Sequence, residues 1–582
     1  MSIYNELEKS IKEIVKKSGY DVDHLFLEPS NRRDLGEFQL NDAMQLAKIY
    51  KENPREIASK IVEEFKKDSR FTNINIAGPG FINFSLSEEY TKEILNRIKE
   101  NIYSNINKHE HKKVVIDYGG ANVAKALHVG HLRSANIGEG LKRLAKLLGY
   151  EVLGDAHLGD YGRPLGFVIK EIKEMYPALP YFDEKYTGNY ENIDLPITNE
   201  DLEKIYPLAS AKAKENEEYL EDGRNITVKF QDKERGYYDL WKRIVDISKK
   251  DIKSTYDRLN VSFELWNGES DEMAYFDQLL KICEEKNIIQ ESEGAKVIDV
   301  SKEDDNAPMP PLLMVKSNGS KSYDSTDLAA ILERKENFNP DEIWYVVDAR
   351  QSLHFEQVFR AARKAELVSE KVNLEHIGFG TMNGQDGKPF KTRDGGVMSL
   401  KNLIELVKDA TLKRINSETV SEEEKDEVAE IVAIAALKYA DLLPFRGTDY
   451  IFEIEKFTSL EGKTGPYLLY STIRMKSLLT KAGDFTRDKI KVLSSQTEKD
   501  IALTILNLPN ILDKSLTTKT LNDIAEYLYN LTALYNKFYA ENKVLIEEDL
   551  SKKESWLVLT EIVYNINMLL LDVLGIKVPK KM

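Results

Sequence analysis

The spacing of apolar residues first predicts a small α/β appendage over residues 1–108. Helical periodicity alternates there with a strand-like end, INIAGPGFINFSL, in which Gly78, Pro79 and Gly80 separate two apolar runs. A polar stretch, NINKHEHKK, then precedes the abrupt apolar strand 114–116. We therefore place a domain boundary at residue 108.

The next segment predicts a strand–helix–strand unit. The strand at 114–116 leads into the loop GGANVAKALHVG and then into a helix that Gly149 terminates, and a second strand follows at 151–153. The apolar positions of the helix are Ile137, Leu141, Leu144, Ala145 and Leu148. Such a unit implies a right-handed crossover and a parallel sheet, whose ligands bind where strands end and helices begin.

The remaining pattern completes a three-domain organisation. Residues 171–290 are charge-rich and helical in pattern without a catalytic-looking cluster, so we interpret them as an insertion into a domain spanning 109–415. The apolar segments IWYVVDARQ (343–351) and HIGFGTM (376–382) predict further strands. From about residue 420 the pattern is almost wholly helical, which predicts an all-helical domain over 416–582.

Composition narrows the class of protein. The chain has 582 residues, 42% of them hydrophobic and 31% charged, a balance typical of globular domains. We expect a soluble cytoplasmic protein, because we find no apolar run of about 18 residues or more. Cys283 is the only cysteine, which excludes an intramolecular disulfide and a thiolate-rich metal site. The net charge of −16 argues against a nucleic-acid partner, although a local basic patch is compatible with it.

A histidine pair marks the predicted helix start. His128, Gly130 and His131 lie where free backbone N–H groups and the positive end of the helix dipole favour a phosphate. Two capping or core histidines are the structural alternative. The stretch NVAKALHVGHLRS resembles the HIGH motif of class I aminoacyl-tRNA synthetases, and the arginyl-tRNA synthetases in particular. This resemblance implies a Rossmann-like parallel-sheet catalytic domain, a tRNA-elbow-binding appended domain and an anticodon-binding helical domain.

The resemblance also implies a second phosphate-binding loop. GKPFKTRDGG stands where the family has its KMSK loop, with Lys391, Thr392 and Arg393 in place of Met, Ser and the second Lys. A solvated basic turn is the alternative. In relatives with a degenerate loop, a lysine before HIGH supplies a cation, and Lys125 has that position. Because no metal-ligand cluster is evident, we expect Mg²⁺ to be held mainly by ATP phosphates and water.

The guanidinium of arginine requires carboxylates that accept paired N–H bonds. The family pattern assigns this role to Asp117, Tyr323 and Asp327, with helix capping as the alternative for the two aspartates. Asn122 and Gln351 match family residues that hold the α-amino and α-carboxylate groups of arginine. His354 and Gln357 match the family's ATP-binding stretch, and Gly130 leaves room for the nucleotide. A core histidine is the alternative for His354. Gly119 and Gly120 replace family residues before Asn122, so we expect one side-chain contact to the amino acid to be missing.

The ends of the chain resemble tRNA-binding elements of the family. In SLEGKTGPYLLYSTIR, YNKFYAENKVL and LGEFQLNDAM, and at the C-terminus, the matching residues are Tyr467, Tyr470, Tyr535, Tyr539, Met582, Phe38 and Gln39. Packing in a helical core is the alternative for the tyrosines. The implied reaction forms arginyl-adenylate from arginine and ATP and transfers arginine to tRNA(Arg), which must bind before activation. We expect a monomer. Another HIGH-containing ligase and a non-catalytic RNA-binding paralogue are the rival hypotheses.

Overall fold

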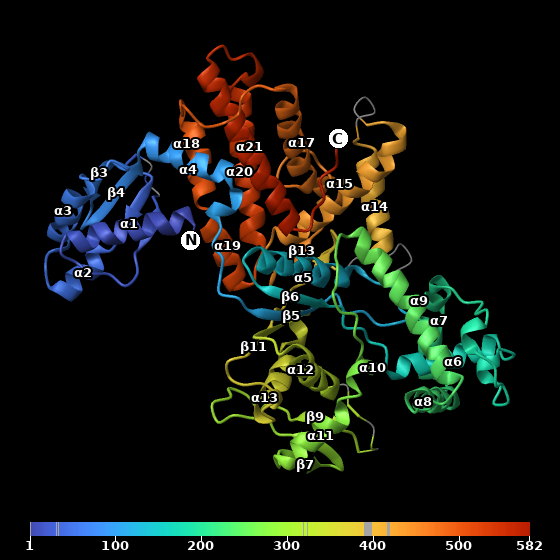
Figure 1. Ribbon diagram of the computed structural model, residues 1–582. Coiled ribbons are helices and arrows are strands. Elements are labelled where there is room, and N and C mark those ends of the chain that lie inside the picture. The colour runs from blue at the N-terminus through green and yellow to red at the C-terminus, as the bar shows by residue number, and fades with distance from the viewer. Residues whose placement is uncertain are drawn as a thin grey trace. The chain divides into compact units, whose positions relative to one another are not determined.

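The structure is a computed structural model that describes residues 2–30, 32, 34–317, 319, 321–322, 324–388, 398–415 and 420–582 (Figure 1). Its internal contacts divide the chain into two compact units. Unit 1 comprises residues 1–108, 468–518 and 523–570, and unit 2 comprises residues 109–467, 519–522 and 571–582. The region 416–467 is therefore grouped with the catalytic part of the chain.

Unit 1 begins with an antiparallel sheet and its helices. The elements are α1(Ile3–Lys17), β1(Leu27–Pro29), β2(Phe38–Leu40), α2(Ala43–Tyr50), α3(Pro54–Phe65), β3(Phe71–Ala77), β4(Phe81–Leu86), α4(Glu88–Glu100) and the 3₁₀ turn η1(Ile102–Asn105). The strand order is β1-β2-β4-β3. At the β3–β4 turn, Gly80 has φ +147° and a Cβ there would lie 2.9 Å from the carbonyl oxygen of Pro54. The turn thus requires glycine.

The C-terminal part of the chain is helical, as its periodicity predicts. Its elements are α17(Gly465–Lys481), α18(Gln496–Leu506), α19(Leu508–Thr518), α20(Asn522–Glu541), η5(Val544–Ile546) and α21(Leu550–Val573). Within unit 1, Asn567 of α21 donates hydrogen bonds to Thr472 of α17 and Thr532 of α20, at 3.2 and 3.0 Å. These buried bonds fix three helices against one another.

Helix α21 corrects one expectation from the sequence. Its 24 residues make it long and apolar enough, by length and composition alone, to cross a membrane. However, 67% of its most apolar window is buried inside the protein. Burial of this kind is typical of the core helix of a helical bundle, so the apolar run is explained by packing.

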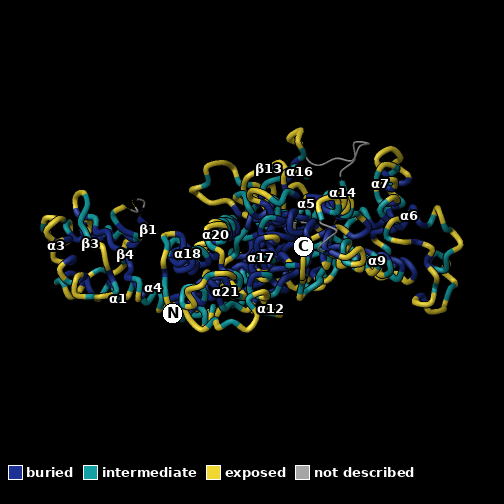
Figure 2. The backbone as a smooth tube through the Cα atoms, turned by 90° about the horizontal axis from the view of Figure 1, so that it is seen from above, coloured by how far each residue is buried: buried dark blue, intermediate teal, exposed yellow. Residues whose placement is uncertain are grey.

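Unit 2 is built on the parallel sheet β11-β10-β5-β6. The elements around it are β5(Lys113–Tyr118), α5(Val129–Leu147), β6(Glu151–Asp155), α12(Asp324–Phe338), β10(Glu342–Val346), η4(Ala349–Gln351), α13(Ser352–Lys364) and β11(Asn373–His376). Helix α5 covers one face, and α12 and α13 cover the other (Figure 1). Most of α5 is buried (Figure 2). The fold predicted from the sequence, with its parallel catalytic sheet, is confirmed.

The region of the predicted insertion, 171–290, is mainly helical, and a small antiparallel sheet begins at its end and continues to residue 315. The elements are α6(Arg163–Met175), η2(Pro180–Phe182), η3(Tyr190–Asn192), α7(Asn199–Glu215), α8(Glu217–Gln231), α9(Tyr237–Arg258), α10(Glu269–Glu272), α11(Phe276–Glu285), β7(Ile289–Ser292), β8(Ala295–Ile298) and β9(Leu312–Val315). The chain returns to the parallel sheet earlier than expected, because Leu265 and Gly268 form parallel bridges with Asp155 and Leu158. Residues 265–268 therefore extend the sheet beyond β6.

A second group of elements follows the sheet in unit 2. It consists of β12(Met382–Asn383), α14(Leu400–Leu412), α15(Glu422–Leu442), β13(Tyr450–Ile451) and α16(Ile454–Phe457). Strand β12 pairs in parallel with β13. Arg133 on α5 binds this group: its Nε lies 2.9 Å from Asp441 of α15, and both side chains are at most 1% exposed. This ion pair fixes the histidine-bearing helix in place, because breaking a buried pair would leave an uncompensated charge.

Candidate active site

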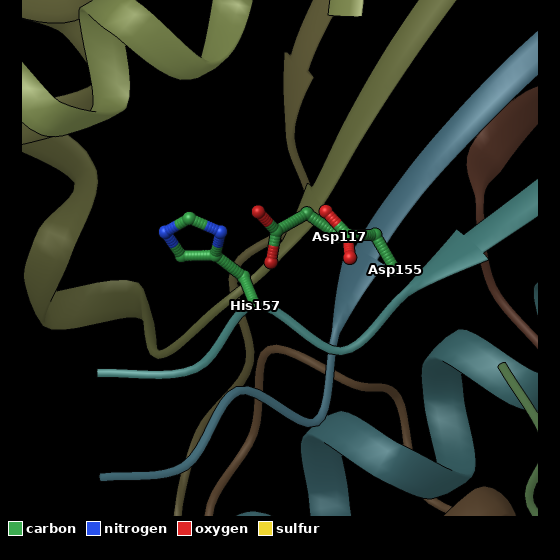
Figure 3. A group of neighbouring side chains, drawn as sticks. All are labelled: Asp117, Asp155 and His157. Atoms are coloured by element: carbon green, nitrogen blue, oxygen red, sulfur yellow. The ribbon is translucent and has the colours of Figure 1, made fainter. Parts of the chain in front are cut away.

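A buried ionic network lies at the carboxyl ends of β5 and β6. Because side chains alternate along a strand, Val115 and Asp117 face α12 and α13, opposite the α5 side. Arg334 of α12 approaches from this side, and its Nη2 lies 2.7 Å from Asp117 and 2.9 Å from Asp155. The Asp117, Asp155 and His157 side chains project into one space (Figure 3), with ligand atoms within 4.8 Å of one another. Arg334 supplies the positive charge that this group faces.

This network gives Asp117 a partner within the protein. Its carboxylate was expected to receive the substrate's guanidinium, and it accepts a hydrogen bond from the internal guanidinium of Arg334. Burial raises the pKa of Asp117, while Arg334 and His157 oppose the rise. Asp117 therefore holds Arg334, and its contact with the substrate stays a prediction. The sequence could not reveal this pair, because 217 residues separate its members.

A second pair of side chains, His157 and Glu272, extends this ionic network. The Nδ1 atom of His157 lies 3.0 Å from Oε1 of Glu272, whose side chain is 1% exposed. Burial raises the pKa of Glu272 to about 7, against the opposing effect of His157. Burial by itself would lower the pKa of His157, but the Glu272 and Asp117 carboxylates raise it well above its usual value. The Glu272 carboxylate therefore favours the protonated form of His157.

Glu269 is a site residue that the sequence reasoning missed. It begins α10, in the region interpreted as an insertion without a catalytic-looking cluster. The pKa of Glu269 is raised to about 7, chiefly by burial; His157 opposes the rise, and the negative charges of Asp160 and Asp327 add to it. Glu269 and Asp327 thus interact electrostatically. The acidic segment WNGESDEM would have indicated a site residue only if the sequence had shown that residues 265–268 return to the edge of the parallel sheet.

Asp327 and His354 are brought into direct contact. The Nε2 atom of His354, on α13, lies 2.6 Å from Oδ2 of Asp327, on α12. The sequence assigned these residues to arginine and ATP, respectively. Gln357 donates a hydrogen bond to the carbonyl oxygen of Pro310 at 2.8 Å. His354 and Gln357, which were predicted to bind ATP, therefore have partners within the protein. Neither residue lines the cavity beside His128 that is described below.

The histidine motif forms the N-terminal cap of α5. Nδ1 of His128 accepts a hydrogen bond from the Gly130 N–H at 3.1 Å, and Nδ1 of His131 accepts one from the His128 N–H at 3.1 Å. A Cβ at Gly130 would lie 2.8 Å from the His128 ring, so a larger residue would displace that ring. A neutral ring that accepts at Nδ1 carries its proton on Nε2, which is then a donor. The Nδ1 atom of His131 also lies 3.2 Å from the His128 carbonyl oxygen. The capping alternative and the phosphate-binding hypothesis are therefore compatible.

Both rings favour the neutral form. Burial lowers the pKa of His131 to about 3, helped by the positive charges of His128 and Lys125. Burial, and then Lys125, also lower the pKa of His128. At neutral pH the motif thus presents two uncharged imidazole rings at the start of α5.

The low pKa of His131 predicts a pH dependence of stability. Between pH 6.5 and about 3 the unfolded chain protonates this residue and the folded chain does not, so the free energy of unfolding falls as pH falls. Asn at position 131 removes this contribution. From pH 7 to pH 5, His131→Asn should therefore gain about 1–2 kcal/mol relative to the unsubstituted protein. Urea unfolding at both pH values measures this, and an unchanged difference would contradict the neutral histidine.

A cavity of about 720 Å³ opens beside the motif. It is lined by Lys125, His128 and Gly130, by residues 379–382 after β11, and by helix α7 of the insertion. Ser399 also lines it and forms an antiparallel bridge with His128. Ser399, which follows the predicted second phosphate loop in the sequence, therefore lies beside the histidine motif. Lys391, Thr392 and Arg393, and likewise Tyr323, lie outside the described residues.

The predicted amino-acid site lies at the ends of β5 and β10. A Cβ at Gly120 would lie 2.5 Å from the His157 carbonyl oxygen, and Gly119 has φ +67°. The expected missing side-chain contact thus has a steric reason. Asn122 is exposed and bridges to Gly159, while Gln351 is exposed at the end of η4. Both side chains are accessible to a ligand.

Two of the predicted RNA contacts are buried, and these predictions are corrected. Phe38 is 4% exposed and stacks on Phe84 at 5.6 Å, because it occupies the inward position of β2. Gln39 occupies the outward position and bonds Asn41. Tyr535 is 0% exposed, with its hydroxyl 3.3 Å from Thr560. The core alternative therefore holds for Tyr535.

The other predicted RNA contacts reach the surface. Tyr470 is 43% exposed. The guanidinium of Arg474 lies 5.8 Å from the Tyr470 ring and 4.7 Å from the ring of Tyr539, which is partly exposed. Tyr467 and Met582 are also partly exposed. Arg474 therefore lies within cation–π distance of both tyrosine rings.

Comparison with known proteins agrees with this architecture. Family models match residues 5–86 (arginyl tRNA synthetase N terminal domain), 92–454 (tRNA synthetases class I (R), catalytic domain) and 468–582 (DALR anticodon binding domain). The arginine–tRNA ligase of Alkaliphilus oremlandii is 42% identical over 585 residues, covering 100% of both chains. The arginyl-tRNA synthetase structure from Plasmodium falciparum has a TM-score of 0.79 at 26% identity, covering 99% of both chains. The one from Thermus thermophilus, with a TM-score of 0.80 at 20% identity and full coverage of both chains, shares the fold.

The catalytic-domain match covers more than half of the chain and includes both the parallel sheet and the histidine motif, so the protein is a class I aminoacyl-tRNA synthetase. Identity of 42% along the whole length of a relative narrows this further. The chain belongs to the arginyl-tRNA synthetase family.

Proposed function

We propose that the protein joins L-arginine to tRNA(Arg). In the first step a carboxylate oxygen of arginine attacks the α-phosphorus of ATP, and pyrophosphate leaves. In the second, the 2′-hydroxyl of the tRNA's terminal ribose attacks the acyl carbon, loses its proton, and AMP leaves. The observation that carries the proposal is the interaction of the carboxylates of Glu269 and Asp327, close to the end of a sheet whose first helix begins with the histidine motif.

Glu269 and Asp327 receive the guanidinium of arginine. A buried cation needs compensating charge, and the two carboxylates interact electrostatically. Burial first, and then the charges of Asp160 and Asp327, raise the pKa of Glu269, so a cation bound between Glu269 and Asp327 would stabilise both carboxylates. His354 holds Asp327 through its 2.6 Å contact. The family resemblance assigns Tyr323 to guanidinium binding as well.

Asn122 and Gln351 hold the α-amino and α-carboxylate groups of arginine. Both are exposed at the ends of neighbouring strands, where a parallel sheet presents its ligand site. Asp117, Arg334 and Asp155 form the base of this site and keep the strand ends fixed. The fixed geometry places the reacting carboxylate close to the phosphate.

The Nε2–H groups of His128 and His131 donate to the ATP phosphates. Their neutral state means that they stabilise developing negative charge as dipoles. Lys125, Lys391 and Arg393 supply the cations, and Gly130 and Thr392 complete the ATP site. Mg²⁺, held through the phosphates and water, would add further charge neutralisation. We also propose that the enzyme acts as a cytoplasmic monomer and that Tyr467, Tyr470, Tyr539, Met582 and Gln39 contact tRNA.

The test is ATP–pyrophosphate exchange with and without tRNA. We expect exchange with arginine only when tRNA(Arg) is present, because the family resemblance implies that tRNA completes the site before activation. Periodate-oxidised tRNA, which cannot accept the amino acid, is the matched control and should still support exchange if binding alone is required. Rapid exchange with arginine and ATP alone would contradict this order of binding.

A further inference from the structure

Helix α7 forms the wall of the 720 Å³ cavity opposite the histidine motif. This wall consists of Glu203, Tyr206, Pro207, Ser210, Ala211, Lys214 and Glu215. The insertion therefore contributes to the catalytic domain's cavity, because its helix α7 lines the same space as His128 and Lys125. The wall has no role in the proposed reaction so far.

Tyr206 is the wall residue that meets the catalytic side. Its ring centroid lies 5.9 Å from Nζ of Lys125, within the range of a cation–π contact. Pro207 follows it inside the helix and has no N–H to donate to the carbonyl of Glu203.

Lys125 needs such a partner. Its side chain is exposed, and a lysine loses about 2 kcal/mol of rotamer entropy when it is held in one place. The preceding backbone is fixed, because the Ala124 N–H donates to Ser248 Oγ at 3.0 Å and Ala124 has φ +62°. Position 125 is therefore anchored, while the four-carbon stem leaves the ammonium group free to swing. An aromatic face removes that freedom without neutralising the charge.

We propose that Tyr206 is a positioning residue for Lys125. The ring face of Tyr206 holds the ammonium group of Lys125 beside the binding site of the ATP phosphates. This rests on the phosphate role proposed above for Lys125. Any cation–π partner of an exposed lysine is worth only about a two- to fivefold change in an equilibrium. The ring matters through its face, so phenylalanine serves as well as tyrosine and an aliphatic residue does not.

The placement of the lysine is tested independently of catalysis. In the full-length protein with ¹³C-dimethylated lysines, the Lys125 signal, assigned by its loss in Lys125→Arg, should be shifted upfield by the Tyr206 ring current. The shift should persist in Tyr206→Phe and disappear in Tyr206→Leu. Tyr238→Leu, which removes a ring of the same insertion 4.8 Å from Lys242, should leave it unchanged. An unshifted signal in the unsubstituted protein would overturn the positioning role.

The functional consequence is tested by tRNA-dependent exchange. Tyr206→Leu should raise KM for ATP about two- to fivefold, with little change in KM for arginine, and Tyr206→Phe and Tyr238→Leu should match the unsubstituted enzyme. In a Lys125→Met background, Tyr206→Leu should have no further effect. Additive losses in the double variant would show that Tyr206 acts without Lys125. Normal exchange in Lys125→Met together with the ring-current shift would instead overturn the phosphate role of Lys125.

Discussion

Replacing Asp327 with Asn lowers kcat/KM for arginine between about 30-fold and several thousandfold, because a buried charge pair loses one partner. Glu269→Gln has an effect in the same range, because the two carboxylates interact electrostatically. KM for ATP should change little, since ATP contacts other groups. Steady-state aminoacylation with varied arginine gives these constants.

A control variant and a substrate analogue separate charge recognition from damage to the fold. Glu336→Gln alters an exposed carboxylate on the same helix, whose partner is Gln278, and should keep full activity. Citrulline replaces the guanidinium with a neutral ureido group, so Asp327→Asn should bind it no worse than the unsubstituted enzyme does. If Asp327→Asn and Glu269→Gln both retain kcat/KM for arginine within twofold, this pair of carboxylates is not the guanidinium site.

The second large effect concerns the histidine motif. His128→Asn should lower kcat by about 10²–10³, the loss typical of removing one donor to a developing negative charge. Asparagine is a favoured N-cap residue, so this variant keeps an acceptor for the Gly130 N–H and removes only the Nε2 donor. The melting temperature should therefore stay close to that of the unsubstituted protein. Single-turnover formation of arginyl-tRNA measures the chemical step.

His128→Ala provides the comparison. It loses both the cap and the donor, so it should be as slow as His128→Asn and also less stable by about 1 kcal/mol. Near-normal kcat in His128→Asn would leave His128 with the capping role alone. That result would restore the structural alternative that the sequence allowed.

The sequence predicts elements that depend on local pattern. The strand at 114–116, the helix ended by Gly149 and the strand at 151–153 are confirmed as β5, α5 and β6, because each has a clear period and a terminating residue. The position of the histidine motif at the start of α5 follows from the same local signals.

The sequence fails where the site depends on distant segments. Arg334 meets Asp117 across 217 residues, and Glu269 reaches the site only because residues 265–268 extend the sheet. Periodicity carries no information about such returns. Phe38 and Tyr535 show the opposite error, since a family match marks their positions but the strand and helix faces turn both rings inward.

The most direct measurement is the incorporation of each labelled amino acid into total tRNA by the purified protein with ATP and Mg²⁺. We predict that arginine alone is attached, and that this attachment is lost in the Asp327→Asn, Glu269→Gln double variant. Attachment of a different amino acid would contradict the assignment of these two carboxylates to a guanidinium, and attachment of none would contradict the proposed ligase activity.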